Sequence, residues 1–291
     1  MNKLKEFIFI SLFVFFLVAT FLLLQIFYRE SQEEFLKVVF LGVGQGDAVF
    51  IETPNGFKTL IDAGPNSTVV RSISKFLPFY SRSVDLLIAT HSDADHVAGF
   101  VDIINRFNIK SIGQNFVEDN DSLNSEINNL ISEKNIDKYF LQTGDKIIID
   151  PQENIYIEIL WPEKTFKEKD NNDNSVITRI VYGDTEILLT GDASLDIEEK
   201  LIKGLDKEYL ESDILKLGHH GSRTSTSLEF LKIVNPIYIV NSAGKDNRFG
   251  HPHQEVLDIV EDFRENQKIL ETSVLGSIEF QSDGEDVWLV E

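Results

Sequence analysis

The chain has 291 residues, of which 42% are apolar and 11% aromatic, enough for one large hydrophobic core or two small ones. Its 48 acidic residues outnumber 27 basic ones, and the net charge of −21 repels polyanions unless metal ions or local basic groups offset it. The chain has no cysteine, which excludes disulfide bonds, a thiolate nucleophile and thiolate metal ligands.

The N-terminus carries the first predicted element. Residues 7–27 contain no charged side chain, and a helix of this length spans a hydrocarbon core of about 30 Å. No small-x-small cleavage site follows this apolar stretch, so residues 1–29 are predicted to be an uncleaved membrane anchor rather than a signal peptide. Lys3 and Lys5 precede the span and mainly acidic residues follow it, which favours a cytoplasmic N-terminus and an external domain.

A charged linker at 30–36 is predicted to connect the anchor to one domain at 37–291. Apolar runs and turn residues predict strands at 36–41, 48–53, 57–61, 86–90, 155–160, 175–182, 186–190, 214–217, 237–240, 277–280 and 287–290. Helical spacing is found at 97–107, 122–135, 197–205, 227–234 and 254–265. Strands in both halves with interspersed helices predict an α/β (α+β) fold with two sheets flanked by helices.

Two short segments resemble each other. Residues 59–64 and 188–193 each read as a strand that ends in an aspartate beside a glycine. This similarity suggests an internal duplication.

All six histidines lie in three short clusters. In the first, His91, Asp93, Asp95 and His96 follow the predicted strand at 86–90, where a turn can direct all four toward one cation. The alternative is that His91 is a core residue and that the aspartates cap the helix that begins near Val97.

The other two clusters lie in the second half of the chain. His219 and His220 follow the strand at 214–217, and His251 and His253 flank a proline after a glycine-rich loop. We expect one histidine of the last pair, His251, to bind metal.

Two further residues accompany these histidines. Asp192 follows an apolar run and could bridge or complete a metal site. Lys216 is either a contact for a substrate phosphate or a solvated lysine at a sheet edge.

These motifs resemble the metallo-β-lactamase superfamily, and in particular the branch found in the ComEC-type DNA-uptake proteins. The resemblance covers residues 37–290 and rests on matching segments in the family's order, at 43–48, 91–99, 172–176, 189–192, 216–222 and 250–253. It implies a four-layer αββα sandwich with a metal site at one edge between the sheets.

The resemblance also implies roles for individual residues. The metal ligands would be drawn from His91, Asp93, Asp95, His96, Asp192, His219, His220 and His251. Asp47, Asp62, Asn174 and Ser175 would support these ligands, with Asp62 orienting the metal-binding loop. Asp95 or Asp192 would orient the attacking water or accept its proton, and Lys216 would stabilise developing negative charge.

Two departures from the superfamily pattern affect the metal. Asp93 stands where the second histidine is usual, and no histidine lies between His96 and His219. A carboxylate in place of an imidazole lets manganese compete better with zinc. We therefore expect one tightly bound zinc or manganese ion, with or without a second, weaker one.

The resemblance favours cleavage of phosphodiesters, including single-stranded DNA. It also suggests a separate DNA-uptake channel as a partner, because a chain with one span cannot form the pore alone. The acidic composition and the absence of a basic, aromatic-rich run favour a small phosphodiester, lactone, thioester or amide instead. A third reading is a non-catalytic accessory protein tethered to the membrane. The sequence does not set the oligomeric state.

Overall fold

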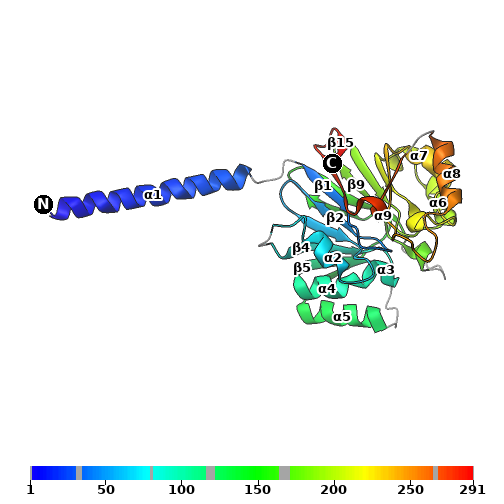
Figure 1. Cartoon of the computed structure of the whole chain (residues 1–291), viewed down its shortest axis with the longest axis horizontal. Helices are drawn as coiled ribbons and strands as arrows, with labels where there is room; N and C mark the ends of the chain where they lie inside the picture. Colours follow the sequence, from blue (N-terminus) through cyan, green and yellow to red (C-terminus); the bar gives the residue numbers. More distant parts are fainter. Residues whose placement is uncertain are drawn as a thin grey trace.

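The computed structural model describes residues 2–30, 35–78, 81–115, 122–163, 171–264 and 268–290. Helix α1 (Asn2–Glu30) projects away from a rounded domain that begins with strand β1 (Figure 1). The predicted division into 1–29, 30–36 and 37–291 stays a prediction, and residues 31–34 of the linker lie outside the described residues.

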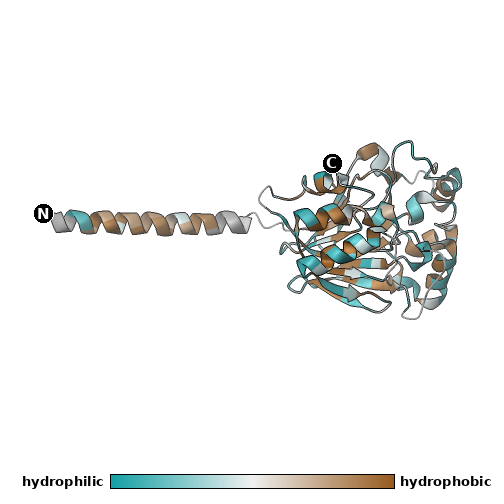
Figure 2. Cartoon of the chain, turned by 90° about the horizontal axis from the view of Figure 1, so that it is seen from below, coloured by the Kyte–Doolittle hydropathy of each residue, from teal (hydrophilic) through white to brown (hydrophobic). Residues whose placement is uncertain are grey.

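Helix α1 is apolar along most of its length (Figure 2). Within the described residues, its segment Lys5–Leu24 is the one stretch long and apolar enough to cross a membrane, with a mean hydropathy of 3.0. A signal sequence near an N-terminus meets the same criterion. Large side chains such as Phe9 and Phe16 are about seven-tenths exposed, so the described part of the domain does not cover them.

The domain is built on two mixed sheets. The first has the order β15 (Val287–Leu289), β14 (Ile278–Ser282), β1 (Leu36–Phe40), β2 (Val49–Glu52), β3 (Lys58–Ile61), β4 (Ser83–Ala89), β5 (Asn108–Gln114) and β6 (Asp137–Phe140). The second has the order β13 (Ile269–Glu271), β12 (Tyr238–Asn241), β11 (Ile214–Lys216), β10 (Thr185–Leu189), β9 (Ile177–Tyr182), β8 (Ile155–Trp161) and β7 (Lys146–Asp150).

Helices cover the outer face of each sheet (Figure 1). The first sheet carries α2 (Thr68–Ile73), α3 (Ala94–Val97), α4 (Gly99–Arg106) and α5 (Ser122–Lys134). The second carries α6 (Leu195–Gly204), α7 (Leu228–Val234) and α8 (Gln254–Phe263), and the short α9 (Thr272–Leu275) follows β13. The predicted four-layer αββα sandwich is confirmed.

Three apolar layers hold the four structural layers together. One lies between the first sheet and its helices, one between the two sheets, and one between the second sheet and its helices. Strand β4 shows how the sequence builds them, because Leu87 belongs to the outer layer whereas Leu86 and Ile88 belong to the central one. An uninterrupted apolar run is what a strand buried on both faces requires.

Each sheet changes from antiparallel to parallel pairing at one strand. Strand β3 pairs antiparallel with β2 and parallel with β4, and β10 pairs antiparallel with β9 and parallel with β11. Asp62 follows β3 and Asp192 lies three residues after β10, so the two similar segments in the sequence hold corresponding places in the two sheets. Because parallel strands end at the same edge of a sheet, the loops that follow β4 and β11 lie beside these aspartates.

Several elements were not predicted from the sequence. They are α2, α3, α9, β5, β6, β7 and β13. Strand β6 is exposed at all four positions and β13 has only three residues, so neither carries the apolar alternation on which strand prediction depends. The predicted helix at 97–107 corresponds to α4, whereas α3 lies almost entirely before it.

Candidate metal centre

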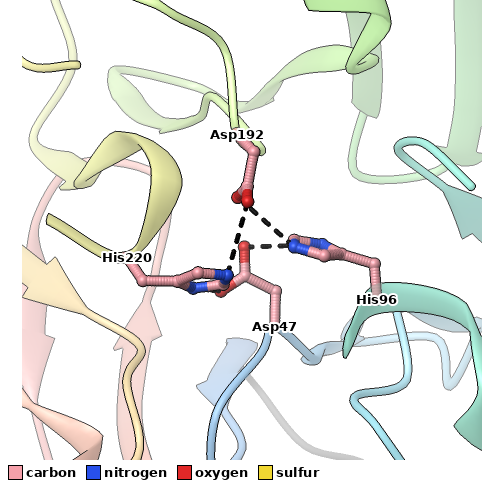
Figure 3. A group of neighbouring side chains, drawn as sticks. All are labelled: Asp47, His96, Asp192 and His220. Atoms are coloured by element: carbon pink, nitrogen blue, oxygen red, sulfur yellow. Dashed lines mark ion pairs between the residues drawn. The ribbon is translucent and has the colours of Figure 1, made fainter. Parts of the chain in front are cut away.

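Four buried side chains from four different segments of the chain converge at one point (Figure 3). Asp47 lies in the turn between β1 and β2, His96 in α3, Asp192 after β10, and His220 after β11. One ligand atom from each lies within 4.8 Å of the others. This is the spacing expected of residues that share one cation.

The contacts within this cluster are close. His96 Nε2 lies 3.3 Å from Asp192 Oδ1, and His220 Nε2 lies 3.4 Å from Asp192 Oδ2. Asp47 Oδ1 lies 3.4 Å from His220 Nδ1. Asp192 is therefore the central carboxylate between the two imidazoles.

A close approach between two loops places Asp47 in the cluster. Gly46 has a φ of 125°, and a Cβ at this residue would lie 2.0 Å from the carbonyl oxygen of Asp95. Only glycine fits there. The glycine thus allows the turn that carries Asp47 to pack directly against the loop that carries Asp95 and His96.

Hydrogen bonds set the orientation of three imidazoles. His96 Nδ1 donates to Asp62 Oδ2 at 2.7 Å, and His220 Nδ1 donates to the carbonyl oxygen of Ser242 at 2.8 Å. His91 Nδ1 lies 3.0 Å from Thr90 Oγ1, whose own proton goes to Asp62 Oδ2. With Nδ1 committed to these partners, each ring directs Nε2 toward the cluster.

Among the residues that the structure describes, these Nε2 atoms have no hydrogen-bond partner. The same holds for Asp47 Oδ1 and Asp192 Oδ1, and all five atoms are buried. An unsatisfied buried polar atom costs about 1–3 kcal/mol, so five at one place would be expensive unless a cation satisfied them. Because imidazole nitrogen and carboxylate oxygen are common donors to zinc and manganese, the residues fit a divalent metal ion.

Charge balance in the cluster points the same way. Burial lowers the pKa of His220, but the Asp192 and Asp47 carboxylates outweigh burial and raise it to about 9. His96 responds similarly, because Asp192 and Asp62 hold its pKa well above 6.5 despite burial. Burial raises the pKa of Asp192, yet His220 and His96 hold it well below its usual value. The carboxylates of the site therefore stabilise a positive charge placed between them, whether a proton on an imidazole or a metal ion.

His91 lies beside the cluster rather than within it. Its ring centroid is 4.1 Å from that of His96, and its Nδ1 also lies 3.4 Å from Ser175 Oγ. Burial, with His96 nearby, lowers its pKa to about 4 against the opposing effect of the aspartates. His91 is thus a neutral imidazole with a free Nε2, which is the form that binds metal.

Asp93 and Asp95 differ in their surroundings. Asp93 precedes α3 at the N-cap position, yet its side chain makes no capping hydrogen bond. Instead Asp93 Oδ1 accepts from Asn171 Nδ2 at 2.5 Å, and Oδ2 lies 3.7 Å from His91 Nε2. Asp95 Oδ2 lies 3.4 Å from His220 Nε2. Asp93 thus faces a histidine of the first cluster, and Asp95 faces a histidine of the second.

The remaining histidines line the exposed side. His219 Nε2 lies 3.7 Å from Asp192 Oδ2 and its side chain is 27% exposed. The His251 ring lies 5.6 Å from that of His219 and 6.3 Å from that of His220. His253 has another use, because its Nδ1 accepts a hydrogen bond from the Arg223 amide at 3.0 Å.

Both His219 and His220 adopt the left-handed backbone conformation, with φ of 46° and 56°. Consecutive non-glycine residues in this region are rare and cost free energy, and such strain concentrates at functional sites. The flanking Gly218 and Gly221 form the rest of this turn, which directs His220 inward and leaves His219 at the surface.

Lys216 is buried behind the cluster with 1% exposure. Its Nζ forms an ion pair with Asp47, donates to the carbonyl oxygen of Gly191 at 3.0 Å and lies 3.8 Å from Asp192 Oδ1. Burial lowers its pKa, but Asp47 and Asp192 outweigh burial and raise it. The catalytic role predicted for Lys216 stays a prediction, and its position shows an ammonium group that neutralises Asp47.

Ser175 contacts the cluster, whereas the contact of Asn174 is with Asn115, and the supporting roles predicted for both residues stay predictions. Ser175 Oγ accepts from the Asp192 amide at 3.1 Å, and the Asn174 carbonyl oxygen accepts from Asn115 Nδ2 at 3.2 Å. The sequence analysis did not predict a role for Thr90 or for Asn171. Asn171 directly precedes the family-matching segment at 172–176. Asp47, predicted to support the ligands, lies within the four-residue cluster itself.

A model of the metallo-β-lactamase superfamily matches residues 41–236, and the chain belongs to this superfamily. ComE operon protein 3 of Bacillus subtilis is 28% identical over 264 residues, which cover 84% of this chain and 33% of that protein. Competence protein ComA of Neisseria gonorrhoeae is 30% identical over 246 residues, with 81% and 31% covered. The chain thus spans about a third of the length of these curated relatives.

A solved structure shares the fold. The metallo-β-lactamase fold protein YhfI of Bacillus subtilis aligns with 88% of this chain and 100% of its own, with a TM-score of 0.56 and 12% identity. This likeness concerns the fold alone. Together with the buried aspartates and histidines, the family assignment is consistent with divalent metal binding.

Proposed function

We propose that this chain is a membrane-anchored, metal-dependent phosphodiesterase that acts on single-stranded DNA or another phosphodiester. The observation that carries the proposal is the buried cluster of Asp47, His96, Asp192 and His220 in a metallo-β-lactamase fold. The relatives named for competence suggest a DNA-related context.

The metal in this proposal is zinc or manganese, held by ligands drawn from His91, Asp93, Asp95, His96, Asp192, His219, His220 and His251. Such an ion would supply Lewis acidity and would lower the pKa of bound water toward neutral pH. Asp62 orients His96, and Lys216 fixes Asp47. Asp95, whose side chain is 33% exposed, is the carboxylate placed to accept a proton on the open side of the cluster.

Helix α1 is the proposed anchor, with the N-terminus in the cytoplasm and the domain outside. The chain lacks cysteine, so a single cysteine introduced at the exposed Lys203 reports the domain's side of the membrane. Labelling of intact cells by a membrane-impermeant maleimide supports the proposed orientation. Labelling only after lysis overturns it.

The main rival is a hydrolase of small lactones, thioesters or amides, and the net charge of −21 favours it over a nuclease. A non-catalytic metal binder is the second rival. Substrate tests on one preparation separate all three.

The test uses the full chain in detergent micelles, loaded with zinc or manganese, with bis-p-nitrophenyl phosphate, single-stranded DNA, a lactone and a thioester as substrates. We expect metal-dependent cleavage that Asp95→Ala and Asp192→Ala reduce at least 100-fold, because both carboxylates face His220. The matched control is Asp102→Ala, which removes a partly exposed carboxylate of α4 paired with Arg106.

The outcomes distinguish the readings. Cleavage lost in both site variants and kept in the control supports the phosphodiesterase. Bound metal with hydrolysis of lactones or thioesters alone overturns the substrate class, and bound metal without any hydrolysis favours the accessory protein. Failure to bind metal overturns the metal-dependent hydrolase.

A further inference from the structure

A cavity of about 480 Å³ opens beside the metal cluster. It is lined by Gln45, Pro65, Ala94, Asp95, Asn247, Arg248 and Phe249. Asp95 connects it to the cluster through the 3.4 Å contact with His220 Nε2. Its volume lies in the range of small-molecule sites, which suits one nucleotide unit.

One wall of this cavity is a braced loop between β12 and α8. Asn247 Nδ2 donates to the carbonyl oxygens of Gly244 at 3.0 Å and His251 at 2.6 Å. Asn247 Oδ1 accepts from the amides of Phe249 at 3.2 Å and His251 at 3.0 Å. Across the cavity mouth, Gln45 Oε1 accepts from the Gly244 amide at 3.1 Å. These bonds fix the backbone of the loop that carries Arg248 and Phe249.

Arg248 and Phe249 form a pair at this wall. The guanidinium carbon lies 4.7 Å from the centroid of the Phe249 ring, which is a cation–π contact. The Phe249 ring stacks on His251 with centroids 5.6 Å apart and an interplanar angle of 24°. Phe249 remains 46% exposed, and Arg248 is also exposed. A large aromatic ring left open beside a metal cluster is not explained by packing in the core.

The chemistry of the pair matches a nucleotide. Bases of single strands stack on aromatic rings and on guanidinium planes, and a guanidinium also neutralises a phosphate. In a chain of net charge −21, a cation at the cavity wall offsets the repulsion that a nucleic acid strand would otherwise meet. A small neutral lactone or thioester requires neither feature.

We infer that the Arg248–Phe249 pair is the subsite for the nucleotide next to the scissile phosphodiester. The base stacks on the pair, and the Arg248 charge neutralises the adjoining phosphate. This inference rests on the proposed phosphodiesterase and names the part of the substrate that the cavity recognises.

The experiment measures binding and cleavage separately. Binding of 5′-fluorescein-labelled d(T)8 to the full chain in detergent micelles is followed by fluorescence anisotropy, and cleavage by gel electrophoresis in manganese or zinc. The variants are Phe249→Ala, Phe249→Trp and Arg248→Ala. Phe140→Ala removes an exposed aromatic ring from β6, and Arg106→Ala removes an exposed arginine from α4, so they serve as matched controls.

Phe249→Ala should raise the Kd and the KM about 5- to 150-fold, the range measured for the loss of one base stack, and Phe249→Trp should restore them. Arg248→Ala should weaken binding and reduce the slope of log Kd against log salt by about 0.7. Thermal melting of each variant verifies that the fold is intact.

Each outcome separates this inference from the proposed function. Oligonucleotide binding that weakens in the Phe249 and Arg248 variants, without cleavage by the unmodified chain, keeps the subsite and overturns the phosphodiesterase. Cleavage by the unmodified chain with both variants equal to their controls overturns the subsite alone. If the unmodified chain does not bind the oligonucleotide, this result also overturns the subsite.

Discussion

Replacing Asp62 with asparagine tests whether hydrogen bonding behind His96 controls metal affinity. Asp62 is 1% exposed and accepts three hydrogen bonds, from the Thr90 amide at 2.9 Å, from Thr90 Oγ1 at 2.7 Å and from His96 Nδ1 at 2.7 Å. Asparagine has nearly the same volume and tolerates the left-handed backbone at this residue, where φ is 57°. The substitution therefore alters charge and hydrogen bonding and leaves the shape in place.

The expected loss follows from these contacts. An amide turns one acceptor oxygen into a donor, so its NH2 group must face either the Thr90 amide or the donors Thr90 Oγ1 and His96 Nδ1. In both orientations a buried hydrogen bond is lost, and His96 loses the carboxylate that makes it a better ligand. Removing such a support typically lowers metal affinity 10- to 100-fold, which equals about 1.4–2.7 kcal/mol.

The assay is competition for zinc and for manganese between the full chain in detergent micelles and a fluorescent chelator. Asp102→Asn, at a partly exposed position of α4, is the matched control and should leave affinity unchanged. Circular dichroism and melting show whether Asp62→Asn still folds. A folded Asp62→Asn protein that binds both metals within twofold of the unmodified chain would refute the view that Asp62 acts through His96.

Two further predictions concern charge in the cluster. Because His220, with a pKa of about 9, and His96, with a pKa well above 6.5, must release protons before their Nε2 atoms bind metal, metal affinity should rise at least about tenfold per pH unit from pH 6 to 8. Chelator competition across this range checks this, and an affinity independent of pH would contradict it. Lys216→Met should lower the free energy of unfolding of the metal-free protein by about 3–5 kcal/mol, because it leaves Asp47 buried without its ion-pair partner. Urea unfolding at pH 7 measures this free energy, with the exposed Lys203→Met as control. A loss below about 1 kcal/mol would show that the buried Asp47 carboxylate does not need the Lys216 charge.

Local sequence determined much of the fold. The apolar run of β4 predicted a strand buried on both faces, and the structure divides its side chains between two apolar layers. The edge strand β6 escaped prediction because its exposed residues carry no apolar alternation. The short helix α3 also escaped, because it lies almost entirely before residue 97, where helical spacing was predicted to begin.

The sequence by itself also determined which residue types could form the site, because strand ends carrying His91, His96, Asp192 and His220 are visible as motifs. Only the tertiary structure decided how they combine. It placed Asp47 in the cluster and paired it with Lys216, since the turn at Gly46 packs against a loop some fifty residues away in the sequence. It also gave His253 a hydrogen bond to the Arg223 amide and left His251 beside the cluster. Sequence motifs specify which donors are available locally, whereas contacts between loops from both sheets determine which donor faces which, and no local pattern encodes those distances.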